Sequence, residues 1–555
     1  MRPPRAAFLI ALIPSFALAQ NAPGYTSGPA PAPSSLADEV QLLRALMADQ
    51  QKQLAEQQNQ IAQLRQQLNA APRPASANAG DSASTPHLIN AGLNTAGLNS
   101  PLSTPSLVQP AGAASDSAPS TESPLSFRIG GADFTPGGIM DFDTIFRTTN
   151  TGNVGTNFFA IPFSNTVGGN LTETRMTAQN SRVSLKATEK FGKNDVTGYV
   201  EIDFIGNDAA NVQVTASSHT VRQRLYWVDL KRDKWEFLGG QSWSWLTPNR
   251  VGLSPAPADI FYSCDFDFNY QVGLTWTRAP QVRVVYHPDE HWAFGVALEN
   301  PQQFGGQGEV TFPFAFNAQL GVQIDQATLS GAPNLHPDII PKVAYDTNVG
   351  GKHFHGELAG LFTGVKVTNT VGGVFRKHTN EGEGVEAAAN LELFKNFHFV
   401  MSGFYSSGGG RYIFSMGPDA VVLPNALGTD VRVSLVHSGS GIAGLEYQVR
   451  PHTLLYGYYG AAYFQRNFAL DTTAGATQGS FAGFGYPGSP TSHNRDIQEP
   501  SIGWTQVFWK NPQYGALQLG TQVSYLTRSP WFVPSRAPKN ARLVMVWEDF
   551  RYILP

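Results

Sequence analysis

From about residue 127 onward, apolar and polar side chains alternate along segments of roughly ten residues, and Gly, Pro, Asn and Asp separate the segments. In residues 196–204, for example, Val200 and Ile202 share one face of an extended chain, while Glu201 and Asp203 share the other. A period of two predicts β-strands that have one apolar and one polar face. About sixteen such segments lie between residues 137 and 554.

The length of these segments and their aromatic residues indicate strands that cross a membrane. A tilted transmembrane strand needs roughly ten residues, and aromatic side chains gather where such strands meet the two interfaces. Aromatic residues stand near the predicted strand ends at Tyr226, Trp227, Trp243, Trp245, Trp504, Trp509 and Trp547. The sequence therefore predicts an all-β transmembrane barrel of about 16 antiparallel strands over residues 126–555, wide enough for a water-filled lumen. A secreted β-rich enzyme or adhesin is the alternative that alternation alone leaves open.

The N-terminal part of the chain has a different texture and divides into four segments. Residues 1–19 carry two arginines, a short apolar run and an Ala-Leu-Ala site, as a secretory signal peptide does. Residues 20–35 and 69–125 are rich in Ala, Ser, Pro and other small or polar residues, which predicts a disordered segment and a flexible linker. Between them, residues 36–68 contain no Gly or Pro.

Residues 36–68 show a heptad repeat. Apolar residues recur every seven positions at Val40, Met47, Leu54, Ile61 and Leu68. Leu43 and Leu64 occupy the complementary seam position, and Gln50 and Gln57 fill it in the middle. The pattern predicts an α-helical coiled coil in the periplasm, and its mixed seam suits a trimer as well as a dimer.

Composition narrows the range of functions. The 555 residues include 38 Lys and Arg and 42 Asp and Glu, a net charge of −4, which gives no electrostatic reason to expect a nucleic-acid partner. The single cysteine, Cys264, excludes a disulfide within the chain. We find no catalytic motif, and we expect no enzymatic activity, cofactor or metal. His353, His355 and Glu357 share one strand face and could ligate a metal, although polar lumen lining is the favoured interpretation.

Assigning the apolar residues of each strand to lipid places the basic residues in the lumen. A charged side chain that faces lipid at mid-depth costs about 2–4 kcal/mol. On residues 181–191, outward Val183 and Leu185 turn Arg182 and Lys186 inward. On residues 221–230 we assign Leu225 and Trp227 outward, which leaves Arg222, Arg224 and Tyr226 inside.

The same rule places Arg283 and Arg432 inside, since each stands between two valines, while Pro280 leaves the phase of Arg278 undetermined. These residues are expected to line one wall of the lumen, and we call them the basic strip: Arg182, Lys186, Arg222, Arg224, Arg278, Arg283 and Arg432. Guanidinium groups stay charged and offer two parallel donors to carboxylate or phosphate groups. Each residue could equally be paired with Glu201 or Asp203 and confer no selectivity.

Three long irregular stretches, at residues 246–267, 302–337 and 470–495, are predicted to be loops. The first follows the fifth strand counted from Gly137, and we expect it to fold into the lumen as a constriction loop. Its acidic residues Asp259, Asp265 and Asp267 would then face the basic strip and create a transverse field. Hydrogen bonding to the backbone, or a divalent cation, are the alternatives for these carboxylates.

The order of the segments, and several short runs, resemble the DcaP-like porins of Gram-negative outer membranes. The runs are Val221-Arg-Gln-Arg-Leu-Tyr-Trp-Val-Asp-Leu230, Leu238-Gly-Gly-Gln-Ser-Trp-Ser244, Arg278-Ala-Pro-Gln-Val-Arg283 and Arg551-Tyr-Ile-Leu-Pro555. This resemblance implies a homotrimer in the outer membrane, a periplasmic coiled-coil extension and passive uptake of small anions such as dicarboxylates.

Three functions are therefore compared. The leading hypothesis is a diffusion channel that prefers small anionic solutes. A sugar-type porin is a second, because aromatic residues cluster at Tyr456, Tyr458, Tyr459, Tyr463 and Phe464. A third is a structural tether, in which the coiled coil contacts the cell wall and the barrel is only a lipid-embedded anchor.

Overall fold

The computed structural model describes residues 123–152, 155–206, 219–255, 261–265, 269–306, 309–324, 334–414 and 417–555. The predicted signal peptide and coiled coil lie outside the described residues, as does nearly all of the predicted linker. Among the residues that the structure does describe, no helix has the length and apolar character needed to cross a bilayer.

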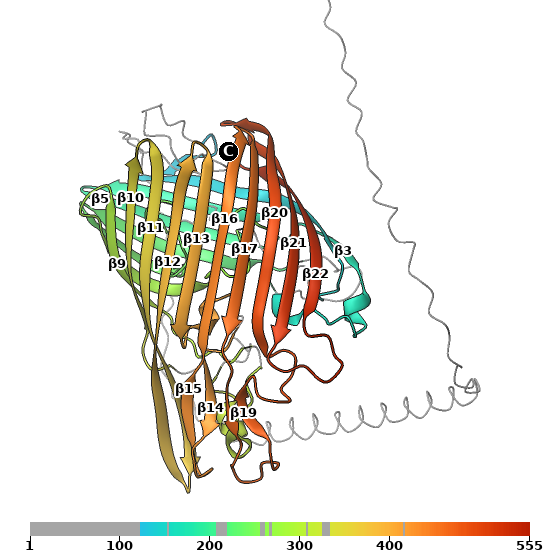
Figure 1. Ribbon diagram of the computed structural model, residues 1–555. Helices are drawn as coiled ribbons and strands as arrows, with labels where there is room; N and C mark the ends of the chain where they lie inside the picture. The colour runs from blue at the N-terminus through green and yellow to red at the C-terminus, as the bar shows by residue number, and fades with distance from the viewer. Residues whose placement is uncertain are drawn as a thin grey trace, which may run out of the picture. The chain divides into compact units, whose positions relative to one another are not determined.

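One antiparallel sheet contains most of the strands (Figure 1). Its members are β1 (Phe127–Ile129), β2 (Ala132–Arg147), β3 (Glu173–Thr177), β4 (Arg182–Phe191), β5 (Asn194–Asp203), β6 (Arg222–Arg232), β7 (Trp235–Trp243), β8 (Arg278–Tyr286), β9 (Trp292–Glu299), β10 (Asp338–Val349), β11 (Lys352–Val371), β12 (Val374–Phe394), β13 (Phe397–Ser407), β16 (His437–Arg450), β17 (Thr453–Phe464), β20 (Asn494–Asn511), β21 (Gly515–Pro530) and β22 (Ala541–Ile553). Each long strand pairs with the next along the chain, so the sheet is an up-and-down meander.

The sheet closes on itself because β2 pairs with β22, from Ile139 opposite Ile553 to Arg147 opposite Met545. The other edge of β2 pairs with both β3 and β4, which together form the second wall strand. Counting β3 and β4 as one strand, and setting aside the short hairpin partner β1, reduces the 18 strands of the sheet to sixteen wall strands. The prediction of an antiparallel barrel of about sixteen strands is confirmed.

The two ends of the barrel differ in the length of their connections (Figure 1). At the end where the C-terminus lies, short turns of two to five residues join neighbouring strands. Gly350 and Gly351 form one of them, and their φ angles of +61° and +77° suit the tight hairpin turn that follows the strand twist. The opposite end carries the long connections, among them residues 148–172, 244–277, 300–337, 408–436 and 465–493.

Strands β11 and β12 extend beyond their neighbours at the loop end, as Figure 1 shows, and are joined there by Gly372 and Gly373. Two small two-stranded sheets lie at the same end, β14 (Ala420–Pro424) with β15 (Val431–Leu435), and β18 (Asn467–Leu470) with β19 (Phe481–Phe484). The connections also contain short helices, which are η1 (Phe158–Ala160), η2 (Gly168–Asn170), η3 (Phe314–Phe316), α2 (Asn317–Leu320) and η4 (Gly410–Tyr412).

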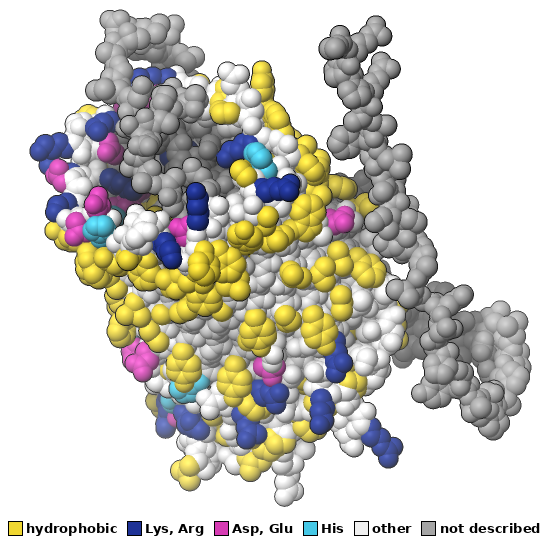
Figure 2. Space-filling model, turned by 45° about the horizontal axis from the view of Figure 1, so that its top comes forward, with side chains coloured by type: hydrophobic (Ala, Val, Ile, Leu, Met, Phe, Trp, Pro, Cys, Tyr) yellow, Lys and Arg dark blue, Asp and Glu magenta, His cyan; other side chains and the backbone are white. Residues whose placement is uncertain are grey.

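The outer surface of the barrel is apolar and the inner surface is mixed. On β22, Val544 and Phe550 point outward and are exposed. Leu543 and Trp547 lie on the opposite face of the same strand and are buried inside the barrel. Figure 2 shows hydrophobic side chains over the side of the barrel, with Lys and Arg collected toward its two ends. An apolar belt with charges confined to its margins is what a membrane-spanning barrel presents to lipid.

Candidate functional site: the barrel lumen

The connection between β7 and β8, residues 244–277, folds into the barrel, and we call it the inner loop. The backbone and side-chain nitrogens of Asn249 both donate to Glu357 Oε1 on β11, each at 3.1 Å. Farther along, the backbone nitrogen of Val272 donates to Glu499 Oε2 on β20 at 3.1 Å. These partners lie on the wall far from β7 and β8, so the loop crosses the lumen and narrows it. It follows the fifth wall strand, where the sequence predicted a constriction loop.

An ion pair holds the first part of the inner loop. Arg250 Nη1 lies 2.8 Å from Glu446 Oε2 on β16, and the guanidinium group stacks 4.9 Å above the ring of Tyr262. The hydroxyl of Tyr458 on β17 donates to the other oxygen of Glu446 at 2.7 Å. Sequence reasoning missed Arg250, because 196 residues separate it from its partner and no local pattern connects them.

Arg222 and Arg224 lie inside the barrel, but both are paired with carboxylates of β5. Arg222 donates to both oxygens of Asp203, at 3.0 and 2.6 Å, and remains a quarter exposed. Arg224 is buried and donates to Glu201 at 2.6 Å and to Asp203 at 2.9 Å. Arg224 is therefore a structural cross-link within the wall, while Arg222 retains contact with the lumen.

The faces predicted for the rest of β6 are wrong. The register of β5 against β6 shifts at Arg224, which leaves one extra residue on β6. A bulge of this kind exchanges the two faces of the strand beyond it. Leu225 and Trp227 are consequently buried inside the barrel, and Tyr226 is 57% exposed on the outside.

On β4 the faces agree with the sequence. Val183 and Leu185 are exposed on the outer surface, and Arg182 and Lys186 are partly buried on the opposite face of the strand. Strand β4 pairs with β5, and Arg182 lies directly opposite Asp203. The wall formed by β4, β5 and β6 thus carries Arg182, Lys186 and the ion-paired Arg222 together.

Arg278 and Arg283 lie on β8, beside two tryptophans at the start of the inner loop. Arg283 faces inward, is 4% exposed and stacks 4.5 Å above the ring of Trp245. Arg278 begins the strand and lies 5.4 Å from the ring centre of Trp243, which Arg224 also approaches to 5.7 Å. Trp243 therefore brings together arginines from β6 and β8.

Arg432 does not belong to the strip, which corrects the sequence assignment. It lies on β15, which pairs only with β14 in a small sheet outside the barrel wall. Val431 and Val433 are buried, and Arg432 is exposed on the other face. The alternation that indicated a wall strand is real, but the apolar face of β15 packs on other loop-end elements instead of facing lipid.

Of the three acidic residues predicted on the inner loop, Asp259 and Asp267 lie outside the described residues. Asp265 is fully buried, and Gln522 on β21 donates to its carboxylate at 3.0 Å. Burial raises the pKa of Asp265 well above its usual range, and the nearby carboxylate of Glu499 raises the pKa further. Asp265 therefore binds the wall at β21 instead of facing the basic strip.

His355 and Glu357 belong to a closed network of hydrogen bonds. The two ring nitrogens of His355 lie 2.8 Å from Asp346 Oδ1 and 3.0 Å from Glu357 Oε1. Lys342 Nζ on β10 lies 2.6 Å from the other oxygen of Glu357 and also donates to the inner-loop carbonyls of Trp245 and Thr247. Since both imidazole nitrogens are used, the polar-lining interpretation fits this cluster better than a metal site.

Buried carboxylates outnumber buried cations in the part of the chain that the structure describes. Nineteen Asp and Glu residues are buried among the described residues, against seven Arg and Lys residues. Three of the carboxylates, Asp141, Asp143 and Asp549, have oxygens within 4.8 Å of one another, and Arg551 contacts two of them.

The aromatic cluster on β17 is divided between the two faces of the strand. Tyr456 and Tyr458 face inward, are almost fully buried and bond to Gln522 and Glu446. Tyr459 and Tyr463 are about half exposed on the outer surface (51% and 45%). The cluster consequently forms no continuous row of rings along the lumen.

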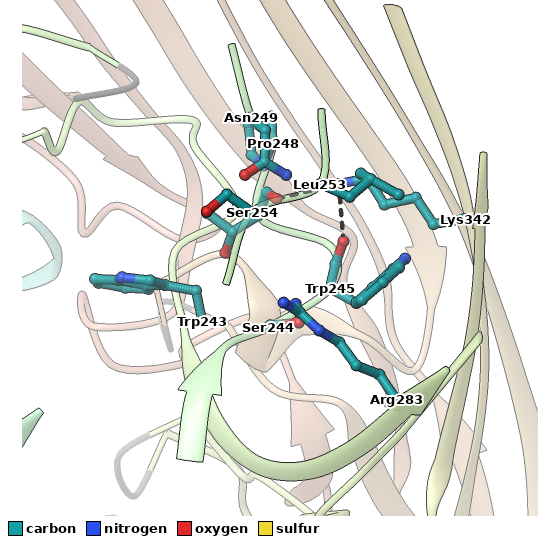
Figure 3. Close-up of a pocket in the computed structure, with 10 residues that line it drawn as sticks. Trp243, Ser244, Trp245, Pro248, Asn249, Leu253, Ser254, Arg283 and Lys342 are labelled. Carbon is teal, nitrogen blue, oxygen red and sulfur yellow. Dashed lines mark hydrogen bonds between the residues drawn. The ribbon is translucent and has the colours of Figure 1, made fainter. Parts of the chain in front are cut away.

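A pocket opens where the inner loop leaves β7 (Figure 3). Its lining residues are Trp243, Ser244, Trp245, Thr247, Pro248, Asn249, Leu253, Ser254, Arg283 and Lys342. It is thus enclosed by the start of the inner loop on one side and by β8 and β10 on the other.

Comparison with known proteins gives a likeness of fold. No protein-family description and no curated protein sequence matches the chain. Among solved structures, the outer membrane channel DcaP of Acinetobacter baumannii matches with a TM-score of 0.52 and 16% identity, over 76% of this chain and 98% of that one. OprB of Pseudomonas putida (12% identity, 76% and 94% covered) and OmpF of Salmonella typhi (10%, 77% and 100%) both match at a lower TM-score of 0.41. The first likeness shows that this chain and the DcaP channel share the same barrel fold.

Proposed function

We propose that the protein is an outer-membrane porin, a passive channel through which small solutes diffuse. The observation that carries this proposal is a closed sixteen-strand barrel with an apolar outer surface and a loop that narrows its lumen. The shared fold with a protein described as an outer membrane channel supports it. Diffusion through such a lumen needs no nucleotide, cofactor or covalent step.

The finer proposal is a preference for small anions, and the wall at β4 to β6 supports it. Arg222 and Arg224 are paired with Asp203 and Glu201, and Arg182 and Lys186 on β4 add two further positive charges to this wall. Arg182 and Lys186 are only partly buried, whereas Glu201 and Asp203 are buried. A partly exposed cation raises the local anion concentration in a narrow lumen.

The test is permeation by two solutes of equal size and different charge. Protein in liposomes should let arabinonate pass faster than arabinose. Vesicles that stay impermeable to both solutes would contradict the channel, and equal rates would leave a channel without anion preference.

We also propose that three copies assemble in the outer membrane, with residues 36–68 forming a periplasmic coiled coil that transport does not require. The heptad pattern of that segment supports the assembly. Light scattering of the detergent-solubilised protein should give a trimer. Deletion of residues 36–68 should preserve permeation, whereas loss of permeation in a correctly folded deletion variant would favour the cell-wall tether.

A further inference from the structure

Three buried carboxylates meet where the barrel closes, and we call them the seam carboxylates. Asp141 and Asp143 lie on β2 and Asp549 lies on β22, the two wall strands whose pairing completes the sheet. Their side chains are on the inner face of the wall, and none of the three residues is more than 4% exposed. One oxygen from each carboxylate lies within 4.8 Å of the oxygens of the other two.

One guanidinium group serves two of the seam carboxylates. Arg551 Nε lies 3.3 Å from Asp141 Oδ2, and the same guanidinium group also contacts Asp549. Asp143 accepts hydrogen bonds from two uncharged donors instead, each at 2.6 Å. Ionised carboxylates this close together repel one another strongly in a buried site, so the seam carboxylates must share protons or hold a cation.

Two oxygens at the seam are buried and accept no hydrogen bond from the described residues. One is Asp141 Oδ1. The other is Oδ1 of Asn180, a residue that is 1% exposed. The amide nitrogen of Asn180 donates to Asp143 Oδ2 at 2.6 Å, so its amide group is directed at the seam carboxylates. A buried acceptor without a donor points to a water molecule or an ion that supplies the missing contact.

Calcium suits the chemistry and the spacing of these oxygens. Ca²⁺ binds about six to eight oxygen atoms, including those of carboxylates and amide carbonyls, at roughly 2.3–2.6 Å. Two oxygens on one such ion are therefore about 5 Å apart at most, which agrees with the spacing of the seam carboxylates. Mg²⁺ demands nearly ideal octahedral geometry, which suits ligands from three separate chain segments less well.

We propose that a calcium ion binds between Asp141, Asp143 and Asp549, with Asn180 as a further ligand, and joins the two strands that close the barrel. Asn180 belongs to the connection between β3 and β4, so the ion fastens three segments from opposite ends of the chain. This site does not depend on the proposed channel function. It also departs from the expectation, drawn from the sequence, that the chain holds no metal, because only the closure of the sheet brings β2 beside β22.

Terbium is the probe for the test, because it binds to oxygen ligands as calcium does and emits light when a nearby tryptophan is excited. Trp547 Nε1 donates to Asp143 Oδ1 at 2.6 Å, so an ion at the seam lies close to an indole ring. The full-length protein is refolded into detergent micelles in the presence of EDTA, and the EDTA is then removed. Added terbium should give a luminescence that saturates, and calcium should displace it.

Asp549→Asn removes one ligand charge and should weaken calcium binding by about tenfold or more. Glu548→Gln is the matched control, since Glu548 is the neighbouring residue on β22 and is exposed on the outer face of the wall. It should bind terbium and calcium as the unaltered protein does. If Asp549→Asn does not fold, Asp141→Asn takes its place.

Calcium should also raise the temperature at which the barrel unfolds, measured by the heat-dependent shift in gel mobility. We expect this rise in the unaltered protein and in Glu548→Gln, and little or none in Asp549→Asn. No saturable luminescence together with no effect of calcium on unfolding would overturn the site and leave the seam carboxylates to share protons. Equal calcium binding by Asp549→Asn and Glu548→Gln would also overturn it, because the ion would then lie elsewhere on the protein.

Discussion

Arg250 of the inner loop and Glu446 of β16 form an ion pair across the barrel, with Arg250 Nη1 2.8 Å from Glu446 Oε2. The side chain of Glu446 is 3% exposed and that of Arg250 is 14% exposed. Tyr262 stacks on the guanidinium group, and Tyr458 donates to the carboxylate. The pair therefore fixes the position of the inner loop, and with it the width of the lumen.

Replacing Arg250 by Met should loosen the inner loop. Removing one partner of a buried pair leaves the other charge without compensation and costs about 3–5 kcal/mol. We expect a larger and noisier single-channel current in planar bilayers. The double variant Arg250→Met with Glu446→Leu should be less noisy than Arg250→Met alone, because it leaves no buried charge uncompensated. Noise in Arg250→Met no greater than in the unaltered protein would show that the pair does not hold the loop.

Lys186 should contribute to selectivity. Replacing it by Gln removes one positive charge from the wall at β4 to β6 and should lower the ratio of chloride to potassium permeability. A charge about 4 Å away attracts chloride and repels potassium by about 1 kcal/mol each in water, so the ratio should fall by about thirtyfold or less. The control is Arg432→Gln, because Arg432 lies outside the barrel wall. Equal shifts for both variants would contradict the placement of the field.

Arg224 should matter for stability more than for selectivity. It is buried and bonds to Glu201 and Asp203, so Arg224→Met leaves two carboxylates short of a donor. We expect a loss of about 3–5 kcal/mol in the free energy of unfolding. Urea unfolding, followed by gel mobility, measures this loss, and Arg222→Gln should lose less because Arg222 is a quarter exposed. An Arg224→Met barrel as stable as the unaltered protein would refute the cross-link.

The contact between Asp265 and Gln522 of the barrel wall should depend on pH. Because burial and Glu499 raise the pKa of Asp265, its carboxyl group, while buried against the wall, keeps its proton to a higher pH than it would in water. The burial of Asp265 against the wall is therefore most favourable below the ordinary carboxyl pKa of about 4, and it becomes less favourable as pH rises through the raised pKa. Arg147 is the nearby cation that opposes this shift.

Current noise should accordingly increase with pH in the unaltered protein. Asp265→Asn cannot ionise and keeps an acceptor for Gln522, so its noise should stay constant. A pH dependence that persists unchanged in Asp265→Asn would assign the effect to another group.

The fold follows from the sequence because a strand that separates lipid from a lumen must alternate with a period of two. That rule located the wall strands and the connection that becomes the inner loop. It failed at Arg224, where a bulge adds one residue and exchanges the faces of Leu225, Tyr226 and Trp227. It failed again at Arg432, since a two-stranded loop sheet that packs on its neighbours alternates like a wall strand.

The partners of the charged residues could not be predicted. Arg250 and Glu446 are 196 residues apart, and Asp265 and Gln522 are 257 apart. Such pairs depend on how the inner loop crosses the lumen, which no local pattern records.

The reversal potential of the purified protein in a planar bilayer under a KCl gradient tests the central claim most directly. A potential whose sign shows chloride to be more permeant than potassium is the predicted result. A potential that shows potassium to be more permeant would contradict the anion preference and assign control to the acidic interior, and no conductance from inserted protein would contradict the channel itself.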